Sequence, residues 1–156
     1  MFSKILVPLD GTPECEAALL PAIEIARKFD SAVVLLSVTA GYGTILGASA
    51  AESFGSSGSV EAAAAVAQAN EEVAGAYLDG IRQAQGSPAW ETVLAEGNSA
   101  EEIVAQARAL QADLIVMATH ARSGLKRLFI GSVAEDVIRR CGVPVLVVHT
   151  LDQPED

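Results

Sequence analysis

Short apolar runs recur along the chain, and segments with helical spacing separate them. Five runs read as strands: residues 4–9, 32–38, 90–95, 113–118 and 143–148. Four are nearly continuous in apolar character, which is typical of parallel strands buried on both faces, whereas 90–95 alternates. Apolar residues three and four apart predict helices over 13–29, 60–85, 99–110 and 132–140. This alternation predicts an α/β fold, an open, doubly wound, five-stranded parallel sheet with helices on both faces.

Several residues mark where these elements should begin and end. Thr12 can cap the first helix, and Ser99 with Glu102 three residues later forms a capping-box pattern. Gly142 can stop the last helix. Pro144, near the start of the last strand, indicates either an edge strand or the point where a strand begins.

The length of 156 residues fits one domain, which we place at residues 1–150, with a tail at 151–156. Residues 40–59 are rich in glycine and serine and predict a long loop, with room for a short helical piece at 48–53. Loops of this length inside a domain are usually functional or disordered. This one could close over the site or stay disordered.

Composition narrows the partners and the compartment. The net charge of −10 disfavours nucleic acid and anionic membranes, because both need clustered Lys and Arg. Cys15 and Cys141 form no metal-type or redox pair, and with only His120 and His149 a zinc site has few ligands. We therefore expect two small apolar thiols in a reducing compartment, the cytoplasm. No targeting segment or membrane span is expected either.

Ligands of doubly wound sheets bind at the carboxyl ends of the strands, near the point where the strand order reverses. That rule selects Leu9–Asp10, Val38–Thr39 and 117–120. Asp10 could accept hydrogen bonds from a ribose or base, hold a Mg²⁺ bound to phosphate, or simply cap the helix near Pro13. His120 has no evident partner that would make it a general base. No catalytic residue is predicted, because no P-loop or nucleophile elbow is present.

The step from Gly131 to Ser132 opens the last predicted helix. Exposed N–H groups at such a helix start favour an anion, and a glycine permits close approach of the backbone. Half of the ten Lys and Arg residues fall between 122 and 140, a basic patch that suits a polyphosphate: Arg122, Lys126, Arg127, Arg139 and Arg140. The alternative is that Ser132 only caps the helix while the basic residues are solvated or meet a partner subunit.

Taken together and in order, several segments resemble the universal stress protein family over nearly the full chain. They are 5–10, 113–120, 124–127, 131–135 and 143–148. The resemblance implies a Rossmann-like fold of the adenine nucleotide α-hydrolase type. It also implies a homodimer paired through 143–148, which would bury an exposed sheet edge. One branch of the family binds ATP and carries Gly-x2-Gly-x9-Gly-[Ser/Thr].

In this chain the spacing of that motif is intact, but Ala118 and Ala121 replace its first two glycines. The retained Gly131–Ser132 step places the chain nearer the ATP-binding branch. By the resemblance, two groups of residues line the nucleotide site. The adenine and ribose pocket would be lined by Pro8, Leu9, Asp10 and Val38. Its other wall would be formed by Met117, Ala118, His120 and Ala121. The phosphates would be held by Gly131, Ser132, Val133 and Ala134, with Arg122, Lys126 and Arg127 nearby.

The expected function is therefore that of a stress-response regulator. It would bind ATP, with Mg²⁺, as a homodimeric sensor or switch, and would be at most a weak ATPase that uses Asp10 to hold the metal. The two alanines motivate an alternative. In that case the chain would be an interaction module that binds no nucleotide and works through its dimer surface and the 40–59 loop.

Overall fold

Five apolar segments form one parallel sheet with the strand order β3-β2-β1-β4-β5. The structure is a computed structural model, and it describes residues 1–41, 57–86, 90–121 and 131–151. The strands are β1 (Lys4–Pro8), β2 (Ala32–Thr39), β3 (Trp90–Glu96), β4 (Leu114–Ala121) and β5 (Val145–Leu151). All four neighbouring pairs are parallel. The predicted five-stranded doubly wound sheet is confirmed, and Pro144 does precede an edge strand.

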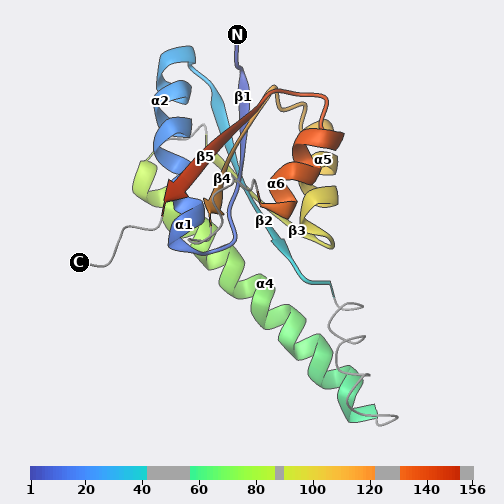
Figure 1. Cartoon of the computed structure of the whole chain (residues 1–156). Coiled ribbons are helices and arrows are strands. Elements are labelled where there is room, and N and C mark those ends of the chain that lie inside the picture. Colours follow the sequence, from blue (N-terminus) through green and yellow to red (C-terminus); the bar gives the residue numbers. More distant parts are fainter. Residues whose placement is uncertain (42–56, 87–89, 122–130, 152–156) are drawn as a thin grey trace, which may run out of the picture.

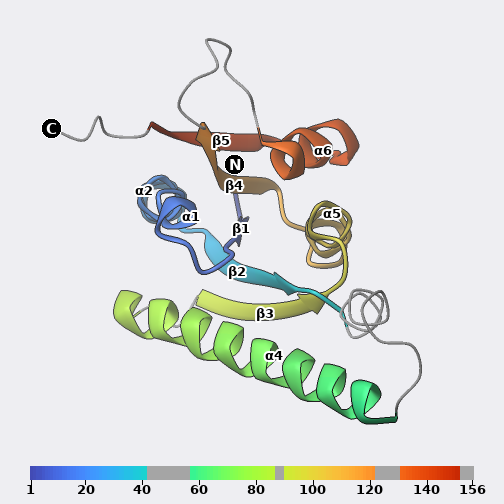
Figure 2. The same cartoon turned by 60° about the horizontal axis from the view of Figure 1, so that its bottom comes forward.

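Helices cover both faces of this sheet (Figures 1 and 2). Helices α1 (Pro13–Glu16), α2 (Leu19–Phe29) and α4 (Ser57–Gln85) lie on one face. Helices α5 (Ser99–Ala109) and α6 (Ser132–Arg140) lie on the other. This two-sided arrangement explains the continuous apolar runs, because neighbouring residues of a strand point to opposite faces and both faces are covered.

The core accordingly has two halves. Ile5, Val7 and Val33 pack on the face of α2 and α4, whereas Leu6, Val34 and Leu36 pack on the face of α5 and α6. All six of these side chains are fully buried. Burial of this kind stabilises the sheet by about 1.5–3 kcal/mol for each large aliphatic side chain. Trp90 opens β3 and is 7% exposed in the first half of the core, at the amino end of the sheet.

The strand order reverses between β1 and β4. The chain builds β1, β2 and β3 in one direction, crosses the sheet through α5, and adds β4 on the other side of β1. Backbone pairing between β1 and β4 covers only Ile5–Leu114 and Leu6–Ile115, so the carboxyl ends of the two strands are not paired. A crevice at such a reversal is where doubly wound sheets bind their ligands.

The predicted helix over 13–29 is wrong as a single helix, because it is split into α1 and α2. Thr12 caps α1 as predicted, and its hydroxyl accepts from Cys15 N. The break at Ala17 and Ala18 follows from Pro21, which has no N–H to donate to the carbonyl of residue 17 and whose ring crowds that carbonyl.

The capping box predicted at Ser99 is also wrong. The N-cap of α5 is Asn98, whose side-chain oxygen accepts from Glu101 N at 3.2 Å, and Ser99 is the first helical residue. Asn and Ser are comparable capping residues, so the sequence pattern alone does not separate them. Gly97 decides it with a φ of +144°, which turns the chain so that Asn98 takes the extended cap conformation.

The end of α6 differs from expectation as well. We predicted that Gly142 could stop the helix, but the C-cap is Cys141, in extended conformation with φ −82° and ψ 134°. The chain therefore leaves α6 directly toward β5. This strand begins at Val145, two residues later than predicted. Pro144 has no N–H to donate, and only its carbonyl pairs with the sheet, by accepting from the N–H of Ile115.

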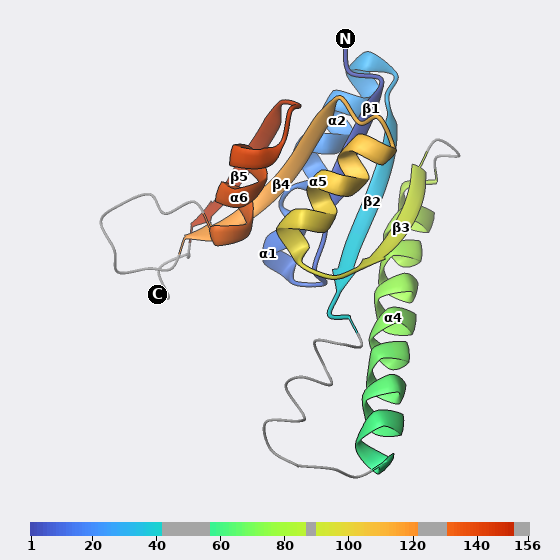
Figure 3. The same cartoon turned by 90° about the vertical axis from the view of Figure 1, so that its right-hand side faces the viewer.

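Helix α4 begins at Ser57, three residues before the predicted start, so the end of the predicted 40–59 loop is helical. The Ala-rich sequence that follows favours this extension. By the rise of an α-helix, its 29 residues span about 43 Å, and the amino-terminal part reaches past the carboxyl ends of the strands (Figure 3). The predicted helical piece at 48–53 lies outside the described residues.

Candidate functional site

A cavity of about 450 Å³ opens at the carboxyl edge of the sheet, where the strand order reverses. Residues after β1, at the end of β4 and in β2 form its floor, and the first turns of α1, α5 and α6 form its rim. Its lining comprises Pro8, Leu9, Asp10, Thr12, Glu14, Cys15, Leu36, Val38, Ser99, Ile103, Met117, Ala118, Thr119, Gly131, Ser132, Val133 and Ala134.

One wall of the cavity is apolar. Leu36 and Val38 from β2, Ile103 from α5 and Met117 from β4 bring aliphatic and thioether side chains to one side. Leu9 closes the floor, since its N–H donates to the carbonyl of Leu36 at 2.8 Å and keeps the two strands together beyond the end of β1. A wall of this kind accepts a flat, largely apolar group.

Asp10 forms a polar corner beside this wall. Its Oδ1 accepts from Thr12 N at 2.9 Å and from Thr12 Oγ1 at 2.6 Å. Burial acts to raise the pKa of Asp10, but the hydrogen bonds from Thr12 and Cys15 outweigh it and hold the pKa below its ordinary value. Asp10 is therefore ionised at neutral pH. It supports the capping residue Thr12 and does not cap the helix itself.

Cys15 lies in the same corner, in the first turn of α1. Burial, followed by its hydrogen bond to the Asp10 carboxylate, raises the pKa of this thiol to about 11. A thiol that stays protonated at neutral pH is a poor nucleophile and a poor metal ligand. Cys15 and Cys141 are both free thiols and half-buried.

The first turn of α6 forms another part of the rim. The N-cap is Gly131, which has no side chain to cap the helix, so no side-chain hydrogen bond closes this end. The N–H groups of Ser132, Val133 and Ala134 have no partner inside the helix, because the first intrahelical bond is from Glu135 N to the carbonyl of Gly131 at 2.9 Å. Unpaired N–H groups at a helix start favour an anion.

Gly131 contributes differently from the prediction. Its N–H donates to Thr119 Oγ1 at 2.8 Å, so it is not free to contact an anion. The φ of Gly131 is −55°, which any residue can adopt. A Cβ at this position would lie 2.9 Å from Thr119 Oγ1, so the need for glycine comes from this contact.

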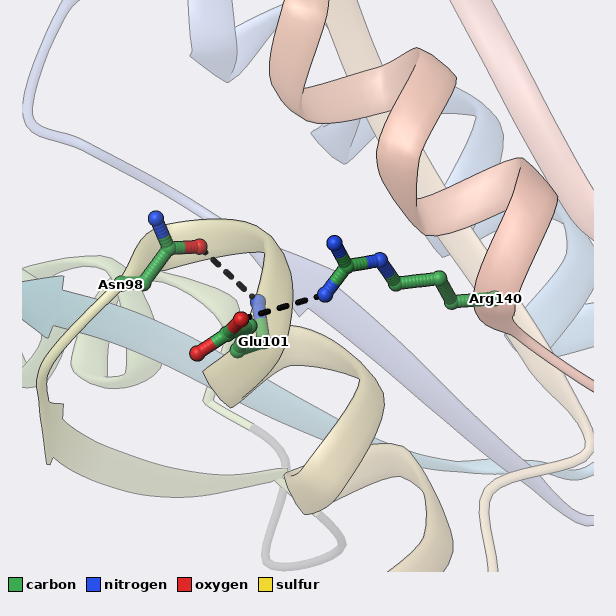
Figure 4. A network of polar contacts seen from close by, with 3 residues as sticks. All are labelled: Asn98, Glu101 and Arg140. Atoms are coloured by element: carbon green, nitrogen blue, oxygen red, sulfur yellow. Dashed lines mark hydrogen bonds and ion pairs between the residues drawn. The ribbon is translucent and has the colours of Figure 1, made fainter.

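The predicted basic patch is wrong for two of its members. Arg139 and Arg140 lie in the last turn of α6, at the far end of the helix from the cavity. Arg139 pairs with Glu135 at 2.6 Å, and Arg140 pairs with Glu101 of α5 at 3.1 Å (Figure 4). These pairs join α6 to itself and to α5. The other predicted members, Arg122, Lys126 and Arg127, lie outside the described residues.

A family model described as the universal stress protein family matches residues 1–149. The chain belongs to this family. Universal stress protein MJ0531 from Methanocaldococcus jannaschii is 34% identical over 148 residues, which cover 95% of this chain and 82% of the relative. The structure described as hypothetical protein MJ0577 superposes with a TM-score of 0.76 at 26% identity, covering 98% of this chain and 99% of the other.

Two further universal stress proteins share the fold and were solved with ligands. A universal stress protein in complex with cAMP has a TM-score of 0.57 at 21% identity and covers 96% of this chain and 98% of the other. The universal stress protein from Archaeoglobus fulgidus in complex with dAMP has a TM-score of 0.57 at 20% identity and covers 94% and 97%.

Most residues that the family resemblance assigned to a ligand site line the one cavity. Those residues are Pro8, Leu9, Asp10, Val38, Met117, Ala118, Gly131, Ser132, Val133 and Ala134. His120 and Ala121 end β4, and their side chains lie outside what the structure describes.

The sequence reasoning missed six residues of the lining: Thr12, Glu14, Cys15, Leu36, Ser99 and Ile103. Thr12 and Ser99 carried a signal as predicted helix starts beside strand ends, since helix starts lie on this edge of the sheet. Leu36 and Ile103 were visible only as core residues. Thr119 lies in the stretch 117–120 that the strand-end rule selected and does line the cavity, but the sequence reasoning gave it no role of its own.

Two absences hold for the part of the chain that the structure describes. Its His, Cys, Asp and Glu side chains form no cluster of three that could hold a metal by itself. In addition, none of its helices combines the length and apolar character needed to cross a bilayer.

Proposed function

We propose that this universal stress protein binds an adenine nucleotide, ATP with Mg²⁺, in the cavity at the carboxyl edge. It acts as a homodimeric stress-response switch in the cytoplasm with little or no hydrolysis. The observation that carries the proposal is that an apolar wall and an uncapped helix start line the same cavity. The cAMP and dAMP complexes of two universal stress proteins with the same fold support this ligand class.

The dimensions and chemistry of the cavity fit such a ligand. Its volume of about 450 Å³ is within the range of about 300–1,000 Å³ typical of small-molecule sites. The adenine ring would lie against Val38, Ile103 and Met117. The phosphates would meet the N–H groups of Ser132 and Val133 and the Ser132 hydroxyl, where the helix dipole favours negative charge.

Asp10 fits either the ribose or the metal that accompanies the phosphates. Its Oδ1 is engaged by Thr12, and its carboxylate remains ionised because its pKa is lowered. A carboxylate with spare acceptor capacity can accept from ribose hydroxyls or join the ligands of a hydrated Mg²⁺, which supplies charge neutralisation for the phosphates.

The alanines at motif positions 118 and 121 are compatible with this function. Both lie within β4, and in the described residues only Asp30 and Gln111 among the non-glycine residues have positive φ. Neither alanine therefore occupies a conformation that requires glycine. Ala118 adds one methyl group to the cavity floor.

We expect slow hydrolysis, because the described lining of the cavity contains no histidine or lysine that could act as a base. Among the described residues that line the cavity, the carboxylates are Asp10 and Glu14. A general base works best with a pKa near the working pH, whereas the pKa of Asp10 is lowered below its ordinary value. ATP bound here would persist, as a switch requires.

The proposed homodimer uses β5, the edge strand beside β4. Leu146 on this strand is 38% exposed, and Val145, Val147 and Val148 are half-buried, so the edge is apolar as well as unpaired within the described chain. Pairing with a second copy would cover it.

The test is nucleotide binding to the purified chain and to one charge variant. The wild type should release adenine nucleotide on denaturation, seen by HPLC, or bind added ATP–Mg²⁺ by calorimetry. Val133→Asp should weaken ATP binding by at least about tenfold, because it places a carboxylate where the phosphates lie. The same change favours the helix, since an acidic residue at a helix start is stabilising, so lost binding would not reflect unfolding.

Two controls isolate the charge at that position. Val133→Asn has a similar size without the charge, and Ile138→Asp places the same charge on an exposed position near the other end of α6. Both should bind ATP within about threefold of the wild type, below the tenfold effect of a 1.4 kcal/mol change. A wild type that carries no nucleotide and binds none would overturn the proposal.

A further inference from the structure

Thr119 joins the end of β4 to the start of α6. It is 7% exposed, and its Oγ1 accepts from Gly131 N at 2.8 Å across 12 positions of sequence. It shares a strand face with Ile115 and Met117, which pack beneath α5 and α6. The hydroxyl is thus an internal anchor point for the first residue before α6.

Thr119 is itself held in place by the neighbouring strand. Its carbonyl accepts from Thr150 Oγ1 of β5 at 3.3 Å, and its backbone is in register with His149 of the same strand. Strand pairing on this side and burial beneath α6 leave Thr119 little freedom to move. A side chain that its neighbours hold rigidly can define the position of the group that it binds.

The contact explains two features of Gly131 together. Glycine is required because a Cβ would lie 2.9 Å from Thr119 Oγ1, closer than Cβ atoms approach other atoms. The hydrogen bond also uses the N–H of Gly131, so the next N–H groups along the chain are those left for a ligand. Close packing against Thr119 is therefore the first reason for a glycine at this position, and anion binding is the second.

We infer that Thr119 is a positioning residue for the phosphate end of the cavity: its hydroxyl fixes where α6 begins and directs the first-turn N–H groups of Ser132, Val133 and Ala134 into the cavity. This inference rests on the proposed nucleotide binding for its consequence, although the contact itself is testable without any ligand. It assigns to Thr119 a role that acts through Gly131 and concerns the phosphates rather than the base.

The first experiment compares Thr119→Val with Thr119→Ser. Valine has nearly the same shape but cannot accept the hydrogen bond, whereas serine keeps the hydroxyl. Thr119→Val should lose about tenfold in ATP affinity by calorimetry, the effect of one lost hydrogen bond to a buried donor, while Thr119→Ser stays within about threefold. Adenosine, followed by ligand-observed NMR, should bind both variants and the wild type equally. Equal losses of ATP and adenosine would show a merely structural role and overturn the inference.

The second experiment tests whether the contact between Thr119 and Gly131 sets the position of the phosphate end of the cavity. Gly131→Ala should weaken ATP binding strongly in the wild type but far less in Thr119→Ala, because the smaller side chain leaves room for the new methyl group. An equal loss in both backgrounds would show that the contact with Thr119 does not set the position of the helix start, and the inference would fail.

Amide hydrogen exchange of the nucleotide-free protein keeps the two proposals apart. The Gly131 amide should be protected in the wild type and in Thr119→Ser, and should exchange at least about tenfold faster in Thr119→Val because its acceptor is gone. Unchanged exchange would overturn the positioning role whatever binds. Protected exchange in a protein that binds no nucleotide would instead refute the proposed function and leave the contact established.

Discussion

Asp10 and Cys15 change each other's acidity in opposite directions. The hydrogen bond between them helps to lower the pKa of the carboxyl and to raise that of the thiol. For Asp10 the folded pKa lies below the ordinary value of 3.8, so its contribution to stability is present above that value and is lost as the pH falls through the folded pKa. For Cys15 the folded pKa is the higher one, so stability is lost as the pH rises from 9.0 toward about 11.

This pair predicts the reactivity of Cys15. In a Cys141→Ser background, Cys15 is the chain's remaining thiol, and its alkylation by iodoacetamide should rise with a midpoint near pH 11. Asp10→Asn should move the midpoint downward, because the substitution removes the neighbouring negative charge. The rate is measured by mass spectrometry over a pH series. The urea-unfolded chain is the control and should show a midpoint near the ordinary value of 9.0. A native midpoint at that value would contradict the structure.

At the scale of elements, helix boundaries depend on single residues whose effect is three-dimensional. Asn98 and Ser99 are adjacent and chemically similar, yet one caps α5 and the other lines the cavity. Figure 4 shows that the helix start set by Asn98 also holds Glu101, which bridges to Arg140 at the end of α6. The cap thus influences the packing of α5 against α6.

Replacing each of these residues by alanine tests the assignment of the cap. Asn98→Ala should lower the free energy of unfolding by about 1 kcal/mol, the usual effect of a lost N-cap, measured by urea denaturation. Ser99→Ala is the matched control and should change stability by less than about 0.5 kcal/mol, since it makes no capping bond. If Ser99→Ala destabilised the protein more than Asn98→Ala, the capping box that the sequence predicts at Ser99 would be correct and the assignment of Asn98 as the cap would be wrong.

The sequence predicts the strands better than the helix ends for a physical reason. Continuous apolar runs such as 32–38 report burial on two faces, which is a property of the strand itself. The break before α2 depends on Pro21, a local signal that the helical spacing of 13–29 concealed.

The candidate site also has features that the sequence predicts and features that it does not. Residues at strand ends and in the Gly131–Ser132 step could be selected from topology and motif. The bond from Gly131 to Thr119 and the pairing of Arg140 with Glu101 could not, because each joins elements whose contact is fixed only when the sheet and α6 assemble.

At the scale of the whole molecule, the sheet has two edges with different surroundings. Helix α4 packs beside β3 and β2 at one edge, whereas β5 at the other edge has apolar side chains and no strand beyond it in the described chain. Unpaired edges of this kind invite pairing with another chain. This asymmetry supports the proposal that self-association uses the β5 side.

A charged substitution on β5 tests that association. The wild type should have a mass of about twice 16.1 kDa by light scattering with size-exclusion chromatography. Leu146→Asp should give a monomer, because two copies would bury like charges at the shared edge. Leu20→Asp, on the exposed face of α2 with 67% of its side chain accessible, is the control and should leave the dimer intact. A dimeric Leu146→Asp protein would place the interface elsewhere.

The position of Trp90 determines what fluorescence can report. It is the single tryptophan of the chain and is buried where β3 begins, at the opposite end of the strands from the cavity. Its emission should shift when the core opens and should stay constant when a small molecule occupies the carboxyl edge. Tryptophan emission should therefore report unfolding and not ligand binding. Stability can then be followed by fluorescence while binding is measured by another method.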